Sequence, residues 1–435
     1  MVFHSRGTSR VGDRFGSDED SFVEADSFVE RGPRADPTAA VFVLPNITNH
    51  QQGPVAAWVS TAGWADAARR VLGNAWIATS TGLVGADEAR RQGSLPALAT
   101  VSERSWRRRI PTVAKTAVKD AREWYRARQF RVEPRGPWHD QDLAFVWQRH
   151  ELFHTAGLEL ARELRVPSVL FAPAMLVWQS NEWGVRRPGW ANRLERVGEQ
   201  RILRRADLVA CGTDVVADHA RRLGVDDDRI IITPTGVDLD RFSGRTDPEH
   251  ARRRLGLAGR FVVGWVGSFR RFHALEQAVD AVARIEGATL LMVGDGPERA
   301  QVEALARERG IAAVFTGTVP HAELPEHLAA MDVCLVLASP GRAFHYSPLK
   351  LAEYLAAGRA VVAPRVAQLA DRLTDGVDAI LVEPGDVQEL ATAIEALRRD
   401  PDGRRRLGAA ARAAAEARWS WDHDVRMVVD ALHAL

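Results

Sequence analysis

The feature that most constrains the fold of this 435-residue chain is a twice-repeated alternation of short apolar runs with helical patterns. Parallel strands need a crossover connection, usually a helix, and strands buried on both faces are apolar throughout. In the first half such runs occupy residues 41–44, 75–79, 143–147, 168–171, 208–211 and 230–233. A second series occupies residues 261–266, 289–293, 314–316, 333–337, 360–363 and 379–382. The sequence therefore predicts an α/β protein with two parallel-sheet domains that meet near residue 240.

The same runs set the expected domain boundaries. We expect an N-terminal domain over residues 39–240, a C-terminal domain over residues 241–410, and a C-terminal helix over residues 411–435 that returns toward the N-terminal domain. Residues 1–38 are rich in Ser, Gly and charged residues and contain the string Asp-Ser-Phe-Val-Glu twice. Such a composition cannot bury enough apolar surface to fold alone, so we expect a disordered extension, with a docking peptide as the alternative.

Charge and cysteine content argue against several classes of function. Lys and Arg number 58 against 57 Asp and Glu, which gives no indication of a nucleic-acid partner. Cys211 and Cys334 each lie inside an apolar run, which argues against a disulfide framework or a zinc site. The sequence has neither the apolar core of a signal peptide nor an apolar stretch of about 18 residues. We therefore expect a cytoplasmic protein.

The clearest local signal for a ligand is a predicted helix from Ser347 to Gly358. Ser347 is a good N-cap, Pro348 suits the first turn, and Gly358 suits the left-handed position past the end. Free amides and the dipole at such a helix start form an anion site, where Lys350 adds positive charge and a diphosphate would fit. The carboxylate of Glu353 could accept two ribose hydroxyls. The alternative is that it pairs with Lys350 or a nearby Arg on a solvated face.

A loop that follows the strand predicted over residues 261–266 offers further anion contacts. Gly267 and Ser268 are small enough to let a ligand approach the backbone, and Arg270 and Arg271 could hold phosphate oxygens. A solvated basic turn is the alternative interpretation.

The next loop, Gly294-Asp-Gly296, also follows a predicted strand and opens a helix. It matches the dinucleotide fingerprint G-x-G-x-x-G only in its first two glycines, because the third position is Arg299. We therefore reject an NAD-binding interpretation.

Taken in order, these segments resemble the family 4 glycosyltransferases (glycosyltransferase group 1), which have the GT-B fold. The resemblance is strong over residues 205–425 and weak over residues 41–140. It rests on the segments already described, on Phe315-Thr-Gly-Thr-Val-Pro320, on Val382-Glu-Pro-Gly385, on Thr235-Gly-Val-Asp-Leu-Asp-Arg-Phe242 at the interdomain crossing, and on Trp419-Ser-Trp421. It implies two Rossmann-like domains with a cleft between them, a nucleotide-sugar donor in the C-terminal domain and an acceptor in the N-terminal domain.

The resemblance also implies roles for residues. Transfer would retain the anomeric configuration, Glu353 would hold the ribose, helix-start amides with Arg271 would hold the diphosphate, and the stretch from Gly317 to Pro320 would hold the base. The residues so assigned to donor binding are Gly267, Ser268, Arg270, Gly294, Gly296, Gly317, Val319, Pro320, His345, Ser347, Pro348 and Leu349.

The chain departs from the family pattern at two positions. The family often has Glu-x7-Glu, and the first of these positions is His345 in this Ser-Pro-Leu-Lys variant. A neutral imidazole cannot accept two hydroxyls as a carboxylate can, so recognition of the transferred sugar stays open. The Lys-Gly pair of the first loop is replaced by His273-Ala274. The donor base and sugar are therefore not predicted.

Four residues form the predicted catalytic set: His150, Arg271, Lys350 and Glu353. His150 follows the strand predicted over residues 143–147, where the resemblance implies a group that faces the acceptor; packing at a helix start is the alternative. Preorganised cationic groups would stabilise the leaving diphosphate by electrostatic catalysis. By resemblance, the diphosphate itself takes the acceptor proton. We expect no cofactor and no metal, and we interpret the three Asp-x-Asp strings as non-metal.

The segment 103–135 combines eleven Lys and Arg with four Asp and Glu, a net charge of +7, interleaved with aromatic residues. Basic aromatic helices of this kind can lie on anionic membranes. A peripheral membrane contact with a lipid-linked acceptor is one hypothesis; a solvated helix beside a sugar or small-molecule site is the other. Ten of the thirteen tryptophans fall between Trp58 and Trp190, and they suit either an acceptor surface or core packing.

Two other functions fit the same motifs. A GT-B-like binding protein without turnover would account for His345 and the long N-terminal extension. A sugar-nucleotide epimerase of the same fold would isomerise the donor without an acceptor.

Overall fold

The computed structural model describes residues 37–45, 56–80, 82–92, 112–182, 184–243, 246–341 and 348–435. Residues 1–36 of the predicted N-terminal extension, His345 and Ser347 lie outside these ranges. The described residues belong to one compact unit that begins at Pro37.

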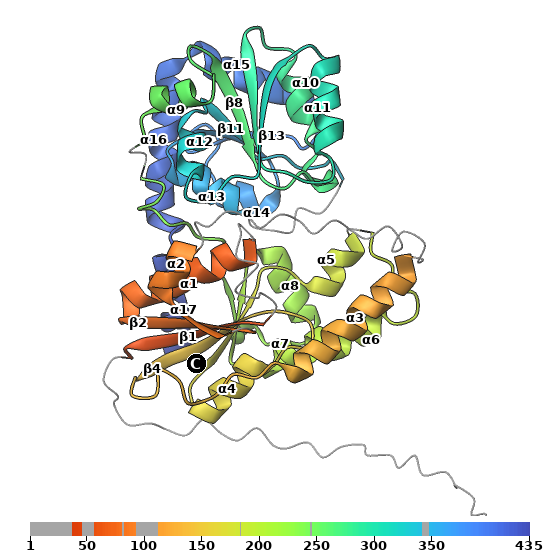
Figure 1. Ribbon diagram of the computed structural model, residues 1–435, viewed down its shortest axis with the longest axis vertical. Helices are drawn as coiled ribbons and strands as arrows, with labels where there is room; N and C mark the ends of the chain where they lie inside the picture. Colours follow the sequence, from red (N-terminus) through yellow and green to blue (C-terminus); the bar gives the residue numbers. More distant parts are fainter. Residues whose placement is uncertain are drawn as a thin grey trace, which may run out of the picture. The chain divides into compact units, whose positions relative to one another are not determined.

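The first sheet is formed by the N-terminal half of the chain (Figure 1). Its strand order is β3-β2-β1-β4-β5-β6-β7, and all neighbours are parallel except β2 and β3. The strands are β1 (Ala39–Leu44), β2 (Asn74–Thr79), β3 (Gly82–Gly85), β4 (Leu143–Arg149), β5 (Ser168–Ala172), β6 (Leu208–Cys211) and β7 (Ile230–Ile232). The helices are α1 (Ala56–Leu72), α2 (Ala86–Gln92), α3 (Thr112–Gln129), α4 (Ala156–Leu164), α5 (Leu176–Glu182), α6 (Ala191–Glu195), α7 (Arg201–Arg205) and α8 (Asp214–Arg222).

The second sheet has the order β10-β9-β8-β11-β12-β13 and is parallel throughout. Its strands are β8 (Phe261–Val266), β9 (Ala288–Val293), β10 (Ala312–Gly317), β11 (Val333–Leu335), β12 (Ala360–Pro364) and β13 (Ile380–Val382). The helices of this half are α9 (Pro248–Arg254), α10 (Glu276–Val282), α11 (Arg299–Glu308), α12 (Leu324–Ala329), α13 (Leu349–Ala356), α14 (Ala367–Ala370), α15 (Val387–Arg399), α16 (Pro401–Arg418) and α17 (Trp421–Ala434).

The predicted α/β class with two parallel sheets is confirmed, and every apolar run that was predicted as a strand contains one. The runs are apolar because both faces of each sheet are covered: β1, β6 and β9 are buried along their whole length. Strand β3 was not predicted, because it is four residues long and begins and ends with glycine. It is an edge strand, antiparallel to β2.

The C-terminal helices are shared between the two halves of the chain. The expected boundary at residue 411 is wrong in detail, because it falls inside α16, whose Ala411 and Ala415 pack in the core of the second sheet. By contrast, α17 packs against α1, with Val425 and Val428 in the core of the first sheet. The return therefore begins at Trp421 rather than at residue 411.

Trp419-Ser-Trp421 holds this return in place. The Trp419 side chain lies in the core of the second sheet, and Trp421 lies in the core of the first. The amide of Val237 in the interdomain crossing donates to the carbonyl of Trp419 at 2.8 Å. A β-carbon at Gly63 or Gly236 would lie 2.3 or 2.7 Å from atoms of Trp421, so both positions need glycine.

Most of the first half's tryptophans that the structure describes serve packing. Trp58, Trp64, Trp138 and Trp147 are almost fully buried. The ring of Trp64 lies 5.8 Å from that of Trp147 and 5.9 Å from that of Trp421. For these residues core packing, and not an acceptor surface, is the correct alternative. No helix in the described ranges is both long and apolar enough to span a bilayer.

Candidate functional site

Three loops meet at the carboxyl ends of β8, β9 and β10, the edge where open α/β sheets bind ligands. The amide of Gly267 donates to Val293 at 2.9 Å, and the amide of Gly294 donates to Gly317 at 2.9 Å. A β-carbon at Gly294 would lie 1.9 Å from the carbonyl oxygen of Gly267, and one at Gly296 would lie 2.7 Å from the backbone of Phe269. These glycines therefore pack the loops against one another, in addition to any approach they allow to a ligand.

The helix predicted from Ser347 to Gly358 is α13, which begins at Leu349. Pro348 occupies the N-cap position with an extended backbone, and its side chain makes no capping hydrogen bond. This corrects the expectation that Ser347 caps the helix with Pro348 in the first turn; Ser347 itself lies outside the described residues. Gly358 has φ 62°, which is the left-handed conformation predicted for it. The first amides of α13 still lack intrahelical acceptors, as in any helix.

Lys350 is buried one residue into α13, with 9% of its surface exposed. Its Nζ lies 4.0 Å from the ring centroid of Trp265, and a β-carbon at Gly267 would lie 2.8 Å from that nitrogen. Among the described residues no carboxylate forms an ion pair with Lys350. Burial lowers the pKa of Lys350 to about 7, although Glu353 acts in the opposite direction. An anion bound here would supply the missing counter-charge.

Glu353 is also buried, with 6% of its surface exposed. Its Oε1 lies 2.7 Å from Nε2 of His321, whose Nδ1 lies 2.6 Å from a terminal nitrogen of Arg241. The alternative in which Glu353 and Lys350 pair on a solvated face is therefore wrong, because both side chains are buried and Glu353 contacts His321 instead. The side chain of Phe242 packs edge-on against His321, with 5.7 Å between ring centroids.

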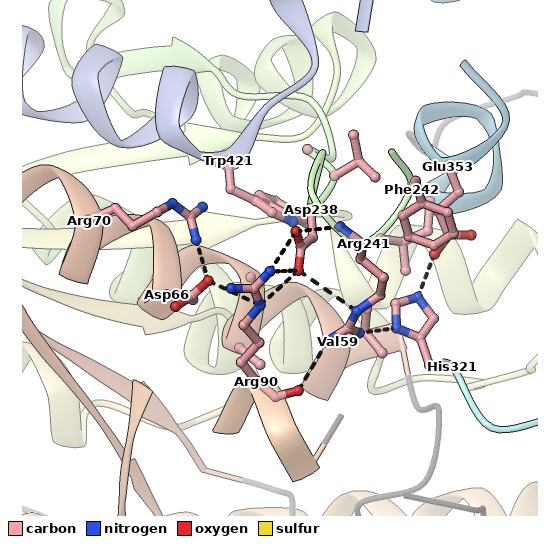
Figure 2. Close-up of a pocket in the computed structure, with 15 residues that line it drawn as sticks. Val59, Asp66, Arg70, Arg90, Asp238, Arg241, Phe242, His321, Glu353 and Trp421 are labelled. Atoms are coloured by element: carbon pink, nitrogen blue, oxygen red, sulfur yellow. Dashed lines mark hydrogen bonds and ion pairs between the residues drawn. The ribbon is translucent and has the colours of Figure 1, made fainter. Parts of the chain in front are cut away.

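Glu353 lines one side of a pocket of about 490 Å³, which is open to solvent (Figure 2). The guanidinium of Arg90 in α2 donates to both carboxylate oxygens of Asp238 in the crossing, at 2.9 and 3.0 Å. On the α1 side of the pocket, Arg70 binds Asp66 and Asp422. The pocket thus joins helices of the first sheet to the carboxylate proposed from sequence for the ribose.

The loop after β8 contains the other predicted phosphate contacts. Ser268, Arg270 and Arg271 are exposed, and neither guanidinium is paired with a carboxylate in the described part of the chain. His273 is buried, with its ring 5.3 Å from that of Trp265, and Ala274 takes a left-handed conformation at φ 49°. Burial lowers the pKa of His273 to about 2, and the charges of Lys350 and Arg270 act in the same direction. His273 is therefore a neutral, buried side chain packed against Trp265, and it does not replace the family's lysine as a cation.

The predicted base-binding stretch leads directly to His321. Gly317 has φ 75°, and a β-carbon there would approach the guanidinium of Arg299 to 3.2 Å. Val319 and Pro320 are half-buried, and Val319 packs on the core of the second sheet. His321 was not predicted as a site residue. The only sequence signal for His321 was that it directly follows the stretch from Gly317 to Pro320, which was predicted to bind the base of the donor.

The expectation that His150 faces the acceptor is overturned by its burial. Its side chain is fully buried, and its Nε2 lies 3.0 Å from Oε1 of Glu199. Glu199 also accepts the amides of Leu176 and Val177, at 2.6 and 3.0 Å. The packing alternative is the correct one, because a histidine with no exposed surface cannot contact an acceptor.

The neighbour of His150, Arg149, is the ionisable group that the structure places at the end of β4. Its guanidinium donates to the hydroxyl of Ser60 at 3.3 Å and lies 3.8 Å from the carboxylate of Glu151. Its buried Nε has no hydrogen-bond partner in the part of the chain that the structure describes. Burial lowers the pKa of Arg149, and Glu151 acts in the opposite direction. Sequence reasoning missed Arg149 because its place at the strand end is visible only once β4 is known to extend beyond Trp147.

The described part of the basic segment is α3, which is docked along one side only. Thr116, Asp120 and Ala127 are buried, and Asp120 accepts two hydrogen bonds from Arg187 at 2.8 and 3.1 Å. Trp124 and Tyr125 are exposed on the helix, and the guanidinium of Arg128 lies 4.1 Å from the ring of Trp124. Residues 103–111 lie outside the described ranges.

Two family matches cover most of the described chain. Residues 260–400 match "Glycosyl transferases group 1", and residues 92–241 match "Glycosyltransferase Family 4". The second match extends the likeness into the N-terminal half, where the sequence motifs alone gave only a weak resemblance.

Similar proteins include two sequence relatives and a solved structure. A 2-deoxystreptamine N-acetyl-D-glucosaminyltransferase of Streptomyces fradiae is 35% identical over 230 residues, 51% of this chain and 54% of the relative. A D-inositol 3-phosphate glycosyltransferase of Geodermatophilus obscurus is 35% identical over 269 residues, 56% of each chain. The chain spans about half the length of these curated relatives. HepE of Anabaena, solved with UDP and glucose, has a TM-score of 0.60 at 18% identity, over 91% of this chain and 99% of that one.

Two Rossmann-like sheets, arranged as in the solved structure named above, define a protein of the GT-B fold class. Within that class, the chain belongs to the group 1 glycosyltransferases of family 4.

Proposed function

We propose that this protein transfers a sugar from a nucleotide-sugar donor to an acceptor, with retention of anomeric configuration. The observation that best supports the proposal is the arrangement at the start of α13. A buried Lys350, which forms no ion pair with a carboxylate among the described residues, lies against Gly267, and Glu353 follows one turn later. A cation, free helix amides and a carboxylate suit the diphosphate and ribose of a nucleotide.

In the proposed complex, the amides that follow Pro348 and the ammonium of Lys350 hold the diphosphate. Arg270 and Arg271 are exposed on the adjoining loop, from which their guanidinium groups can reach phosphate oxygens. Glu353 accepts ribose hydroxyls, and the stretch from Gly317 to Pro320 faces the base.

The proposed chemistry follows from charge. As the bond between sugar and phosphate breaks, positive charge develops on the sugar and negative charge on the leaving diphosphate. Fixed amides, Lys350 and the two loop arginines stabilise the diphosphate without reorganising during the reaction, and one such donor is typically worth about 100-fold or more in rate. The acceptor hydroxyl attacks the anomeric carbon and passes its proton to an oxygen of the departing diphosphate on the same face. We propose that this proceeds without metal or other cofactor.

The acceptor is proposed to bind on the first-sheet side, near the end of β4. The relatives named above act on 2-deoxystreptamine and on D-inositol 3-phosphate, so a small molecule of either kind is a candidate for this chain. A lipid-linked acceptor at the cytoplasmic face of a membrane is also proposed, because α3 exposes basic and aromatic side chains together. Sedimentation with anionic vesicles tests this part, and failure to bind at low salt would remove it.

The main test is a donor screen followed by turnover. The thermal stability of the purified protein is measured with UDP-, GDP- and dTDP-sugars, because a ligand that binds the folded state raises the midpoint. The donor that stabilises the protein is then incubated with candidate acceptors, and glycosylated product is detected by mass spectrometry. Transfer with retained configuration supports the proposal. Isomerisation of the donor without acceptor identifies an epimerase, and binding without any turnover identifies a binding protein.

A further inference from the structure

A chain of hydrogen bonds connects Glu353 to the first sheet (Figure 2). Glu353 contacts His321 at 2.7 Å, and His321 contacts Arg241 at 2.6 Å. A second terminal nitrogen of Arg241 donates to the backbone carbonyl of Arg90 in α2 at 3.1 Å. Asp238 accepts both the amide of Arg241 at 3.1 Å and the guanidinium of Arg90. His321 and Arg241 thus join the carboxylate of Glu353 to the Arg90 carbonyl in α2. Asp238 adds a second link, from the backbone amide of Arg241 to the guanidinium of Arg90.

The arginine determines which nitrogen of His321 bears the proton. A guanidinium has only N–H donors and no acceptor, and it stays charged in proteins. Because Arg241 donates to Nδ1, that nitrogen must present its lone pair. Nε2 then bears the hydrogen of the neutral ring and donates it to Oε1 of Glu353. The carboxylate is held at Oε1, and the described residues form no hydrogen bond with Oε2.

We propose that His321 is a positioning residue for donor binding, which Arg241 holds in the tautomer that donates to Glu353. The inference rests on the proposed role of Glu353 in binding the ribose. Oε1 is fixed by His321, so the second oxygen is aimed at a ribose hydroxyl before the donor arrives. Preorganisation of this kind improves affinity because the carboxylate does not have to be ordered on binding.

The same series of hydrogen bonds makes the orientation of the Glu353 carboxylate depend on the contact between α2 and the interdomain crossing. Arg241 is clamped between the Arg90 carbonyl and Asp238, and Arg90 is itself held by the two oxygens of Asp238. The carboxylate of Asp66 lies 3.6 Å from Arg90 and completes the charged groups around this clamp. Separation of α2 from the crossing would release one side of Arg241. The ribose contact is therefore strongest when the two halves are in the arrangement seen here.

A merely structural role for His321 predicts something different. A buried histidine that only stabilises the fold would alter the melting temperature and would weaken all nucleotides equally. A positioning role weakens only those nucleotides that possess the hydroxyl contacted by Glu353. The ratio of the affinities for a ribonucleotide and its deoxy analogue distinguishes the two roles, because general destabilisation of the fold does not change this ratio.

The experiment compares UDP with 2′-deoxy-UDP and 3′-deoxy-UDP, and GDP with its two deoxy analogues, by calorimetric titration of the full chain. Wild-type protein is expected to bind at least one ribonucleotide about 10- to 100-fold more tightly than a deoxy analogue, since a hydroxyl bonded to a carboxylate is lost. His321→Leu is expected to reduce this ratio to about threefold or less. His321→Gln is expected to keep most of it, because an amide can both accept from Arg241 and donate to Glu353.

Arg241→Met serves as a second variant that leaves His321 packed, in case His321→Leu fails to fold. It frees the imidazole to change tautomer and is expected to lower the same ratio at least threefold. An unchanged ratio in His321→Leu, or in Arg241→Met where the first variant does not fold, overturns the inference while leaving the proposed function intact. Equal binding of ribo and deoxy nucleotides by the wild-type protein instead refutes the proposed ribose role of Glu353.

Nitrogen chemical shifts of His321 give an independent readout. In protein labelled at histidine nitrogens, with the resonance assigned by its loss in His321→Gln, we expect an unprotonated Nδ1 and a protonated Nε2 at neutral pH. The opposite tautomer would contradict the proposal.

Discussion

The two sheets have similar strand orders but present different chemistry at the carboxyl ends of their strands. In the second sheet, three glycine loops are tied together by backbone hydrogen bonds, and Lys350 and Glu353 are buried beside them. In the first sheet, the residues at the end of β4 are mostly core, and Arg149 is a partly exposed ionic group there. The difference indicates that the side chains of the proposed nucleotide site are placed by the fold of the second half. The proposed acceptor side has Arg149 as its candidate contact.

The largest expected effect is that of Glu353→Ala on transfer. Loss of a carboxylate that holds ribose hydroxyls should lower kcat/KM for the donor about 100-fold, while the KM of the acceptor should change little. Glu353→Gln keeps the shape of the side chain but can no longer offer two acceptor oxygens. Its kcat/KM for the donor should lie between those of the wild-type protein and Glu353→Ala. Steady-state kinetics with each substrate varied in turn provide the measurement, and an unaltered kcat/KM would mean that the site is misassigned.

The next effect concerns pH and Lys350. The free pKa is about 7, and a bound diphosphate should raise it. Below that pKa the ammonium is already charged; above it, binding must take up a proton, so affinity should fall by up to about tenfold per pH unit. Titration above pH 7 avoids the second ionisation of the phosphate, which lies near about pH 6. Lys350→Met should bind weakly with no such slope, and a slope that persists in this variant would assign the proton to another group.

Lys350 should also reduce the stability of the unliganded protein. Its folded pKa of about 7 lies below the ordinary value of 10.5, so the unfolded chain binds more protons between these values and stability rises with pH across that window. Lys350→Met removes the buried cation and should raise the melting temperature by roughly a few degrees at neutral pH, while weakening donor binding. Calorimetric melting of both proteins is the check. A lower melting temperature in the variant would show that Lys350 is satisfied without a ligand.

A smaller effect is expected on the acceptor side. Arg149→Gln removes the guanidinium together with its hydrogen bond to Ser60, and it should raise the acceptor KM about tenfold while the donor Kd stays the same. His150→Gln is the matched control, because its side chain is enclosed and should affect only stability. If the two variants had the same kinetic effect, Arg149 would have no special part in acceptor binding.

The sequence predicted the fold well because strand position depends on local patterns. The run from Leu208 to Cys211 and the run from Phe261 to Val266 are strands with those same ends, since apolar residues bounded by polar turns leave little choice of register. The left-handed Gly358 was likewise predictable from its neighbours. The start of α13 was misplaced because an N-cap depends on the backbone of the loop before it.

Contacts between distant residues explain what sequence reasoning missed. His321 and Arg241 are 80 positions apart, and Arg90 and Asp238 are 148 apart, so no periodicity brings them together. The prediction for His150 was wrong for the converse reason: its place after a strand suggested a ligand, but its side chain is fully buried and contacts Glu199. The loops of the proposed donor site could be predicted because each follows a strand. The hydrogen bonds that support the site could not, because they join residues that are distant in the sequence.

Calorimetric titration of UDP, GDP and dTDP into wild-type protein and Glu353→Ala tests the central claim most directly. We predict that at least one nucleotide binds the wild-type chain at a single site, and that Glu353→Ala weakens it about 10- to 100-fold without loss of folded structure by circular dichroism. Equal affinity in the two proteins, or no binding of any of the three to the wild-type chain, would contradict a nucleotide site at α13.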